Sequence, residues 1–221
     1  MTIVLKVGGA STAGVAAAVA ALRESGERVC VVHGAGPQIS GEMERRGLVP
    51  QFVEGRRVTT AEVLEVVRES LAAVNAAVCE AIGPAALALA GDEVGLEAEL
   101  VPGLGFVGRA VPSAPRAVIE ALAAGFVPVV TPLACGPLNV NADEAASALA
   151  VGIGASGIRF LTDVPGVYHE GRLVQTIAAQ RAQALVDGGA FDGGIVPKLL
   201  AAAAAARNGV TAEIGLTAVT G

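Results

Sequence analysis

Short apolar runs alternate along this chain with longer segments whose apolar residues recur at helical spacing. The runs Thr2–Val7 and Arg28–His33 are almost wholly apolar and predict buried strands. Residues 14–25 and 37–47, which follow them, predict helices. Pro37 opens the second of these helices and a glycine ends each, in keeping with the residue preferences of helix termini.

The same alternation continues to the end of the chain. It predicts helices at residues 61–82, 115–124, 142–154, 178–186 and 196–207, strands at residues 87–90, 127–131, 158–162 and 211–214, and short hairpins at residues 51–58, 97–110 and 167–174. Thr59 or Thr60 is placed to cap the first of these helices. Strands that alternate with helices favour parallel pairing through right-handed crossovers. The expected fold class is therefore α/β, an αβα three-layer sandwich with an open, mostly parallel central sheet.

Composition narrows the class of protein. The 221 residues suit one domain or two closely packed lobes, and a 53% hydrophobic content with few aromatics predicts a core of Ala, Val, Leu and Ile. The net charge of −6 and the absence of any basic run argue against a nucleic-acid partner. Three scattered cysteines and a strand that starts at once, with no leader before it, predict a cytoplasmic protein with reduced thiols.

One uncharged stretch, residues 121–142, is long enough to cross a bilayer. It contains three prolines and two glycines, a density of breakers that a membrane helix would not tolerate. We expect a helix end, a buried strand and a glycine-rich loop there, and no membrane association.

Three polar segments interrupt the apolar pattern and carry candidate chemistry. Lys6 ends a strand and is followed by Gly8 and Gly9, where backbone N–H groups can approach a phosphate closely. Residues 139–143 read Asn-Val-Asn-Ala-Asp, and residues 193–198 bring a second lysine, Lys198, to a helix start after a glycine pair. Two lysines, one aspartate and several glycine turns are suited to holding a transferring phosphoryl group.

These segments occur in the order and spacing of the amino acid kinase family, and the chain resembles that family over nearly its whole length. The resemblance also takes in residues 33–37 (HGAGP), 55–59 (GRRVT) and 161–168 (LTDVPGVY). Within the family it is similar to the branch that phosphorylates N-acetyl-L-glutamate. The resemblance therefore implies ATP-dependent phosphorylation of that acid's γ-carboxylate, a step in arginine biosynthesis, with Mg²⁺ arriving on ATP and held mainly by its phosphates.

The resemblance also implies catalytic roles for three residues. Lys6 would bind the transferring phosphoryl group, Lys198 would bind phosphate mainly on the leaving side, and Asp143 would hold both lysines in place. Each has a simpler interpretation: Lys6 as a surface lysine at a strand end, Lys198 as a solvated helix lysine, and Asp143 as the cap of the following helix. Because the positive end of a helix dipole disfavours a cation, Lys198 at a helix start suggests a nearby anion.

The remaining implied site residues surround these three. For the acid substrate they are Gly34, Ala35, Arg57 and Asn139, and for the phosphates and nucleotide they are Gly8, Gly9, Gly36, Asp163 and Tyr168; no metal-ligand cluster is evident in the sequence. Ala35 stands where the family usually has glycine and would be strained if its φ were positive. Arg56 competes with Arg57, since only one of two neighbours in an extended segment faces inward. Asn141 could serve the substrate or only the loop, and His33 is expected to be a buried histidine rather than a catalyst.

The resemblance divides the chain into an N-terminal lobe, residues 1–136, for the acid and for dimerisation, and a C-terminal lobe, residues 137–221, for ATP. Relatives inhibited by arginine carry an extra helix before the first strand. Its absence here predicts a homodimer, formed through helix faces such as those of Ala61–Ile82, and no strong arginine inhibition. The chain also ends where relatives continue into a short final strand. Two alternatives remain open: a kinase of the same fold acting on another acid, such as carrier-protein-bound glutamate or aminoadipate, and a non-catalytic amino-acid or nucleotide sensor.

Overall fold

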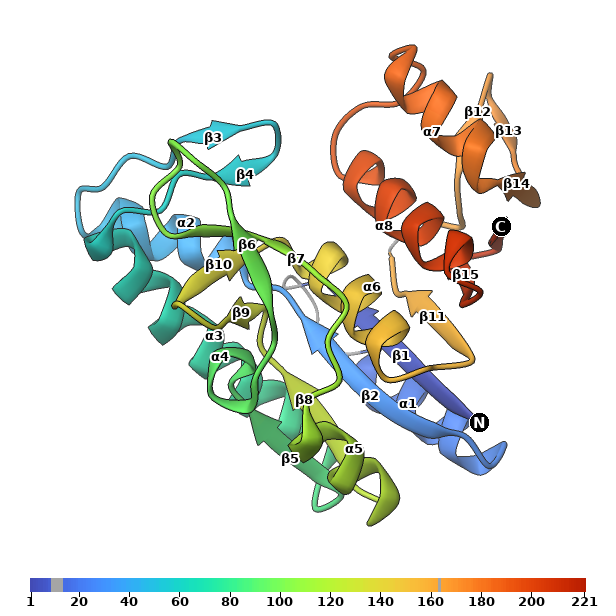
Figure 1. Cartoon of the computed structure of the whole chain (residues 1–221), viewed down its shortest axis with the longest axis horizontal. Coiled ribbons are helices and arrows are strands. Elements are labelled where there is room, and N and C mark those ends of the chain that lie inside the picture. Colours follow the sequence, from blue (N-terminus) through green and yellow to red (C-terminus); the bar gives the residue numbers. More distant parts are fainter. Residues whose placement is uncertain (9–13, 163) are drawn as a thin grey trace.

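The computed structural model describes residues 1–8, 14–162 and 164–221, and an eight-stranded sheet forms its centre (Figure 1). The strands lie in the order β14-β16-β15-β11-β1-β2-β8-β5. Their bounds are β1 Thr2–Val7, β2 Arg28–His33, β5 Ala86–Leu89, β8 Val127–Val130, β11 Gly157–Phe160, β14 Thr176–Ala178, β15 Thr211–Ile214 and β16 Thr217–Thr220. Every pairing is parallel except that of β15 with β16, so the expected mostly parallel sheet is confirmed.

Helices pack on both faces of this sheet and confirm the α/β class. One face is covered by α1 (Val15–Glu24), α2 (Gly36–Arg45) and α3 (Ala61–Ile82). The other face is covered by α5 (Arg116–Ala123), α6 (Ala142–Gly152), α7 (Ala179–Asp187) and α8 (Ile195–Arg207). Thr60 caps α3 by accepting a hydrogen bond from the N–H of Val63 at 3.2 Å, as one of the two predicted caps.

Alternation along β1 determines which way its lysine faces. Ile3 and Leu5 lie in the apolar cluster under α1 and α3, whereas Val4 lies in the opposite cluster with Ala145 and Ala146 of α6. Because successive strand residues face opposite sides, Lys6 shares the face of Val4. The lysine therefore points toward α6.

Smaller sheets stand at the ends of the central strands. Strands β6 (Ala98–Leu100) and β7 (Val107–Ala110) form the predicted hairpin, and a four-stranded sheet is completed by the unpredicted β9 (Leu133–Ala134) and β10 (Leu138–Val140). The other two expected hairpins are confirmed as β3 (Phe52–Val53) with β4 (Arg56–Arg57), and β12 (Tyr168–His169) with β13 (Arg172–Leu173). A short unpredicted helix, α4 (Gly91–Val94), precedes β6.

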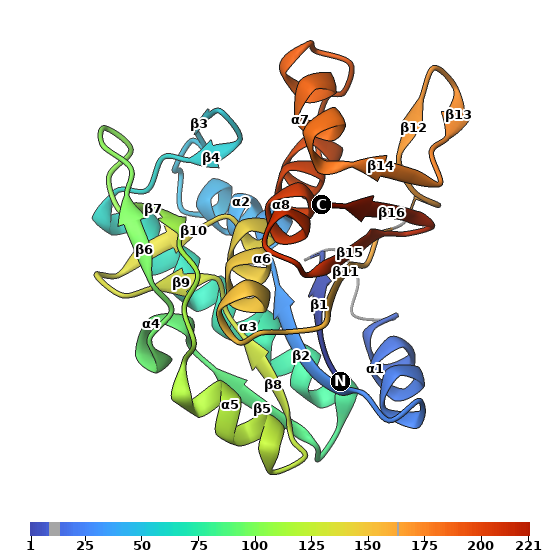
Figure 2. The ribbon, with the colours of Figure 1, turned by 45° about the vertical axis from the view of Figure 1, so that its right-hand side comes forward.

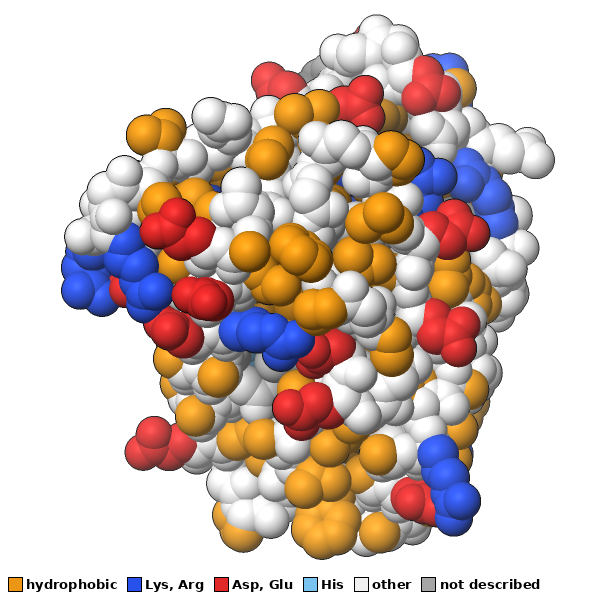
Figure 3. All heavy atoms as spheres, turned by 60° about the vertical axis from the view of Figure 1, so that its left-hand side comes forward, with side chains coloured by type: hydrophobic (Ala, Val, Ile, Leu, Met, Phe, Trp, Pro, Cys, Tyr) orange, Lys and Arg blue, Asp and Glu red, His pale blue; other side chains and the backbone are white. Residues whose placement is uncertain are grey.

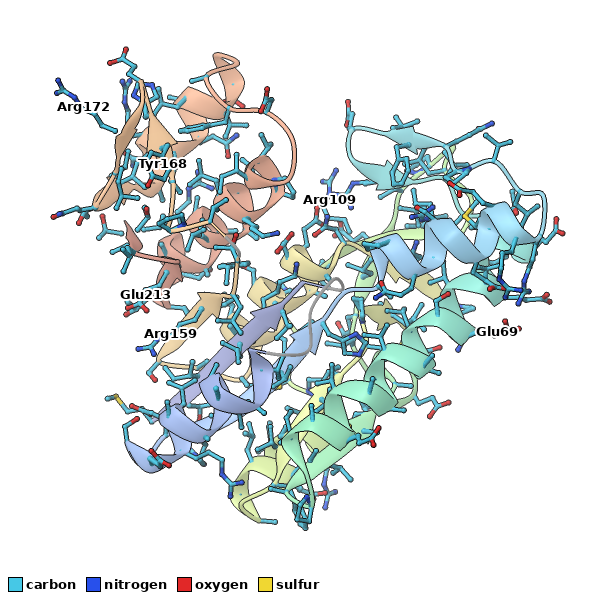
Figure 4. The ribbon with its side chains drawn as sticks, turned by 180° about the vertical axis from the view of Figure 1, so that it is seen from behind. Glu69, Arg109, Arg159, Tyr168, Arg172 and Glu213 are labelled. Atoms are coloured by element: carbon cyan, nitrogen blue, oxygen red, sulfur yellow. The ribbon has the colours of Figure 1, made fainter. Side chains whose placement is uncertain are left out.

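The C-terminal end of the chain differs from the sequence expectation. A final strand is present after all: β16 turns back on β15 and also pairs with β14 (Figure 2). Helices α7 and α8 cover one face of these strands. On the opposite face Arg159 and Glu213 form a solvent-exposed ion pair at 2.9 Å, and Figure 4 shows the two side chains close together on the rear surface. The helical layer on that side is therefore confined to the N-terminal part of the sheet.

The uncharged residues 121–142 contain the expected helix end and buried strand, but two short strands, β9 and β10, lie where only a glycine-rich loop was expected. They comprise the end of α5, strands β8, β9 and β10 and the turns between these elements. Within the described residues, no helix combines the length and the hydrophobicity that crossing a bilayer would require.

Buried alanines join α6 to α8. Ala145, Ala146 and Ala150 of the first helix and Ala202 and Ala205 of the second are nearly inaccessible to solvent. The small side chains let the two helices approach closely, and the Ser147 hydroxyl donates a hydrogen bond to the carbonyl of Ala201 at 2.8 Å. This contact fixes the position of α8, which carries Lys198, relative to α6, which carries Asp143.

Candidate active site

A cavity of about 540 Å³ opens at the carboxyl ends of β1 and β2. This edge is where open parallel sheets usually bind ligands. Nine of the predicted site residues line the cavity: Lys6, Gly8, Gly34, Ala35, Gly36, Arg57, Asn139, Asp143 and Lys198. Residues from segments far apart in the sequence are thus brought to one place.

Asp143 contacts both lysines within this cavity. Its Oδ1 lies 2.9 Å from Nζ of Lys6, and its Oδ2 lies 3.4 Å from Nζ of Lys198. Lys6 and Lys198 are the only lysines in the 221-residue sequence. The chain therefore brings the ammonium groups of both its lysines to a single carboxylate.

The first turn of α6 frees Asp143 for this role. Oδ1 of Asn141 accepts hydrogen bonds from the N–H groups of Asp143 at 2.8 Å and of Glu144 at 3.2 Å. Asn141 is thus the helix cap, and the alternative interpretation of Asp143 as the cap is wrong. Because the cap satisfies the backbone, the Asp143 carboxylate can turn to the lysines.

The electrostatic state of Lys6 follows from its burial. Only 5% of the residue is exposed, and this burial lowers the pKa of its ammonium group below the usual lysine value. The Asp143 carboxylate opposes that shift, and the charge of Lys198 adds to it. The site holds two cations against one anion, so a phosphate would be attracted to it.

Arg57 adds a third cation to the lining of the cavity. It is 7% exposed, and no carboxylate pairs with it within the described part of the chain. Its guanidinium donates hydrogen bonds to the Ser40 hydroxyl at 2.8 Å and the Gly36 carbonyl at 3.2 Å, and it lies 4.7 Å from the centre of the Phe52 ring. Burial lowers its pKa, yet a guanidinium stays charged at neutral pH. A buried cation of this kind is suited to an incoming carboxylate.

A chain of hydrogen bonds connects Asn139 to the same region. The Asn139 amide donates to the Thr59 hydroxyl at 3.1 Å, and that hydroxyl donates to the carbonyl of Arg57 at 2.8 Å. Thr59, predicted from the sequence as a possible helix cap within the 55–59 segment, therefore links Arg57 and Asn139. Its position two residues after Arg57 gave no sign of this role.

The loop after β2 accommodates alanine without strain. Ala35 has a φ of −140°, outside the left-handed region, so the expected cost of replacing glycine does not arise. Helix α2 begins directly afterwards with no side-chain cap. Its uncapped first turn lies at the cavity wall, and such helix starts favour anions.

The other three predicted residues for the phosphates and nucleotide are Gly9, Asp163 and Tyr168. Gly9 and Asp163 are outside the described residues. Tyr168 is on the β12–β13 hairpin, is 48% exposed and does not line the cavity (Figure 4).

A larger hollow of about 1160 Å³ adjoins the catalytic cavity but contains neither lysine. It lies between the β3–β4 hairpin and the outer faces of α6 and α8. Arg56, the neighbour of Arg57, borders both spaces and forms an ion pair with Glu144 at 2.5 Å. Sequence analysis gave no role to Glu144.

His33 is buried beneath the cavity floor, as expected. Its Nε2 lies 3.1 Å from the side-chain nitrogen of Asn75, which also donates to the carbonyl of Val129 at 2.9 Å. Burial lowers the pKa of His33 to about 4, and the nearby charge of Lys6 acts in the same direction. His33 is therefore neutral at physiological pH.

This buried histidine leads to a prediction about acid stability. An unfolded histidine has a pKa near 6.5, so the folded state binds fewer protons between about pH 6.5 and pH 4. The His33 contribution is complete above pH 6.5 and is lost as the pH falls toward 4. We expect it to lower the free energy of unfolding by on the order of 3 kcal/mol across that interval.

Urea unfolding at several pH values measures this contribution. The His33→Gln variant is expected to show a shallower decline in stability from pH 6.5 to pH 4 than the wild type. His169→Gln, at the only other histidine in the sequence, serves as the matched control and is expected to retain the wild-type slope. Equal slopes in the His33 variant and the wild type would refute the prediction.

Comparison with known proteins agrees with this fold. A model of the amino acid kinase family matches residues 1–215. An acetylglutamate kinase of Rubrobacter xylanophilus is 43% identical, with 96% of this chain and 88% of that protein covered. An acetylglutamate kinase of Geobacillus kaustophilus is 38% identical, with 92% of this chain and 85% of that protein covered.

Solved structures extend the similarity. A crystal structure of a Streptococcus mutans protein matches with a TM-score of 0.87 at 25% identity, covering 99% of this chain and 98% of that one. Carbamate kinase from Giardia lamblia bound to AMP-PNP matches with a TM-score of 0.72 at 16% identity, covering 97% and 91%, and shows the shared fold.

The fold and the matches define an α/β kinase. The chain belongs to the amino acid kinase family, whose model matches nearly all of it and whose acetylglutamate kinases are similar to it over most of their length. The family resemblance expected from the sequence is confirmed.

Proposed function

We propose that the chain catalyses ATP-dependent phosphorylation of the γ-carboxylate of N-acetyl-L-glutamate, a step of arginine biosynthesis. The observation that carries this proposal is the cavity in which Lys6 and Lys198 both contact Asp143. Arg57 lines the same cavity and pairs with no carboxylate among the described residues. The names of the similar acetylglutamate kinases support the choice of acid.

The chemistry explains why the site needs cations more than a base. A γ-carboxylate with a pKa near 4.3 is already ionised at neutral pH. One of its oxygens attacks the γ-phosphorus of ATP, the bond from that phosphorus to the bridging oxygen breaks, and ADP leaves with the bonding electrons. Two anions must therefore be brought together, and Lys6 stabilises the charge on the transferring group while Lys198 binds toward the leaving side.

Asp143 keeps both lysines in place but is not free to bind a metal ion. Its two oxygens already contact the two ammonium groups. Mg²⁺ entering with ATP would be held mainly by phosphate oxygens and water, and would supply further neutralisation of phosphate charge.

The other roles follow from position. We assign Gly34, Ala35 and Asn139 to the acid with Arg57, and Gly8, Gly9 and Gly36 to the phosphates. Asp163 and Tyr168 are assigned to the nucleotide from sequence similarity. Residues 1–136 would bind the acid and residues 137–221 the nucleotide; Arg57, from the first part, and Lys198, from the second, both line the cavity.

A coupled assay of ADP release tests the proposed reaction. We expect turnover with ATP and N-acetyl-L-glutamate. Because the product is an acyl phosphate, it can be trapped as a hydroxamate. Much weaker turnover is expected with free glutamate. Activity only with a carrier-bound acid would favour a kinase of the same fold that acts on another acid. No activity with any acid would favour the non-catalytic sensor.

Arg57→Lys is expected to raise the KM for N-acetyl-L-glutamate at least tenfold while changing the KM for ATP little. A lysine retains the charge but cannot reproduce the two parallel hydrogen bonds of a guanidinium, which are worth about 1–3 kcal/mol. Steady-state kinetics with each substrate varied in turn give both constants. A rise in the KM for ATP alone would assign Arg57 to the nucleotide.

We further propose a cytoplasmic homodimer. The free thiols of Cys30, Cys79 and Cys135 support the location. Two features support the dimer. β5 is one of the two edge strands of the central sheet, and α3, which contacts it, exposes several alanines. Hydrophobic side chains gather at the lower end of Figure 3, where β5 and α5 lie. The exposed hydrophobic residues of the chain include Leu87 of β5, Ile119 of α5 and Phe126 shortly after α5. An uncovered edge and an apolar helix face are features that a second copy can cover.

Light scattering after size-exclusion chromatography tests the dimer. We expect a particle of twice the 21.8 kDa chain mass. Placing arginine at the exposed Ala73 and Ala77 of α3 is expected to yield monomers. Ala20→Arg on the exposed face of α1 is the control and should leave the mass unchanged. A wild-type monomer, or a double variant that still dimerises, would contradict this interface.

A further inference from the structure

The β3–β4 hairpin covers the catalytic cavity but is weakly anchored by apolar packing. Phe52, Gly55 and Arg57 of the hairpin segment line that cavity. Phe52 is 55% exposed and Val53 47%, so little apolar surface holds the hairpin to the rest of the molecule. Polar contacts must therefore fix most of its position.

Arg56 supplies the contacts to the opposite side of the cavity. Its guanidinium donates to both carboxylate oxygens of Glu144, at 2.5 and 3.1 Å, and to the carbonyl of Gly108 at 3.2 Å. Both partners of the ion pair are largely shielded from solvent. A bidentate, partly buried pair is stronger and more directional than an ordinary surface ion pair.

Glu144 stands beside Asp143 in the first turn of α6. Oδ1 of Asn141 accepts hydrogen bonds from the N–H groups of both residues. One helical turn therefore holds the two phosphate lysines through Asp143 and the hairpin through Glu144. Arg57 follows Arg56 directly in the sequence, so the position of the hairpin also sets the position of the Arg57 guanidinium.

We propose that Arg56 and Glu144 are positioning residues that latch the β3–β4 hairpin over the acid pocket and hold Arg57 where it meets the substrate's α-carboxylate. This inference rests on the proposed role of Arg57. Arg56 affects acid binding only indirectly, through the position of Arg57, because Glu144 neutralises the charge of Arg56. Of the two adjacent arginines, only Arg57 thus presents an unpaired cation to the substrate.

Steady-state kinetics of Glu144→Gln test the latch. The KM for N-acetyl-L-glutamate is expected to rise about three- to tenfold, the value of a partly buried ion pair. The KM for ATP and the melting temperature are expected to change little. The control is Arg109→Gln, an exposed arginine that borders the larger hollow and makes no ion pair among the described residues; Figure 4 shows it in the space between the lobes. This control should leave both KM values unchanged.

A charge exchange separates a pairwise latch from a general structural effect. Arg56→Glu alone is expected to raise the KM for the acid. The double variant Arg56→Glu with Glu144→Arg is expected to reverse much of that rise. An unchanged acid KM in Glu144→Gln, an equal rise in both KM values, or no restoration by the exchange would each overturn the latch.

A fluorescent reporter gives a readout that does not depend on turnover. The sequence contains no tryptophan, so Val53→Trp places a single one on the hairpin. Its anisotropy is expected to be lower when Glu144→Gln is added, because the released hairpin moves more freely, and equal anisotropy would count against the latch. Failure of Arg57→Lys to affect the acid KM would instead reject the proposed acid site, so the two ideas fail by different results.

Discussion

Lys6→Met is expected to reduce kcat by two or more orders of magnitude while leaving the fold intact. Lys6 is the most buried cation of the site and lies 2.9 Å from Asp143. Losing a charge contact that strengthens in the transition state costs about 3–4 kcal/mol. Methionine has similar length and tolerates burial, and Asp143 retains Lys198 as its partner, so folding should survive.

Single-turnover kinetics and thermal unfolding measure the two parts of this expectation. The matching variant Lys198→Met is expected to lower kcat to a similar degree, because in the proposed reaction Lys198 stabilises the charge that develops on the leaving side. Near-normal turnover in either variant would reject the assignment of phosphate lysines. A loss of activity that accompanies unfolding would show that the lysine is needed for structure.

Asp143→Ala is expected to damage both stability and catalysis. The substitution leaves two ammonium groups near each other, one of them almost fully buried, without the carboxylate that compensates them. Removing one partner from a buried charge cluster typically costs about 3–5 kcal/mol of folding free energy. Turnover should fall at least a hundredfold because neither lysine is then held in position.

Comparison with Asp143→Asn and a double variant isolates the charge effect. Asparagine keeps the shape and can accept a hydrogen bond, so its stability loss should be smaller than that of alanine. Lys6→Met combined with Asp143→Ala is expected to recover much of the stability lost by Asp143→Ala, since the buried charge has been removed as well. A single alanine variant as stable as the wild type would show that the carboxylate contributes little to the fold.

The sequence was informative where chemistry coincides with strong local patterns. Lys6 is the penultimate residue of the six-residue strand β1, and the bounds of this strand were predicted from its apolar run. The choice of Arg57 over Arg56 stays a prediction, because both arginines line the cavity, although Arg56 contacts Glu144 and Arg57 contacts Ser40.

The features that were missed depend on distant contacts or on very short strands. Strands β9, β10 and β14 have only two or three residues each, too few for a periodic signal. Arg56 and Glu144 are 88 positions apart, and nothing local to either residue indicates the other. The φ of Ala35 is set by the way β2 leads into α2, which composition cannot reveal.

The concentration of both lysines on one carboxylate makes the active site open to selective spectroscopy. Uniform ¹⁵N labelling of lysine alone would place every labelled side chain in the site, because the sequence has no others. Their two side-chain resonances would separate by environment, one almost fully buried and one partly exposed. Titration of these signals would follow the protonation of Lys6 directly as acid and nucleotide bind, without any substitution in the chain.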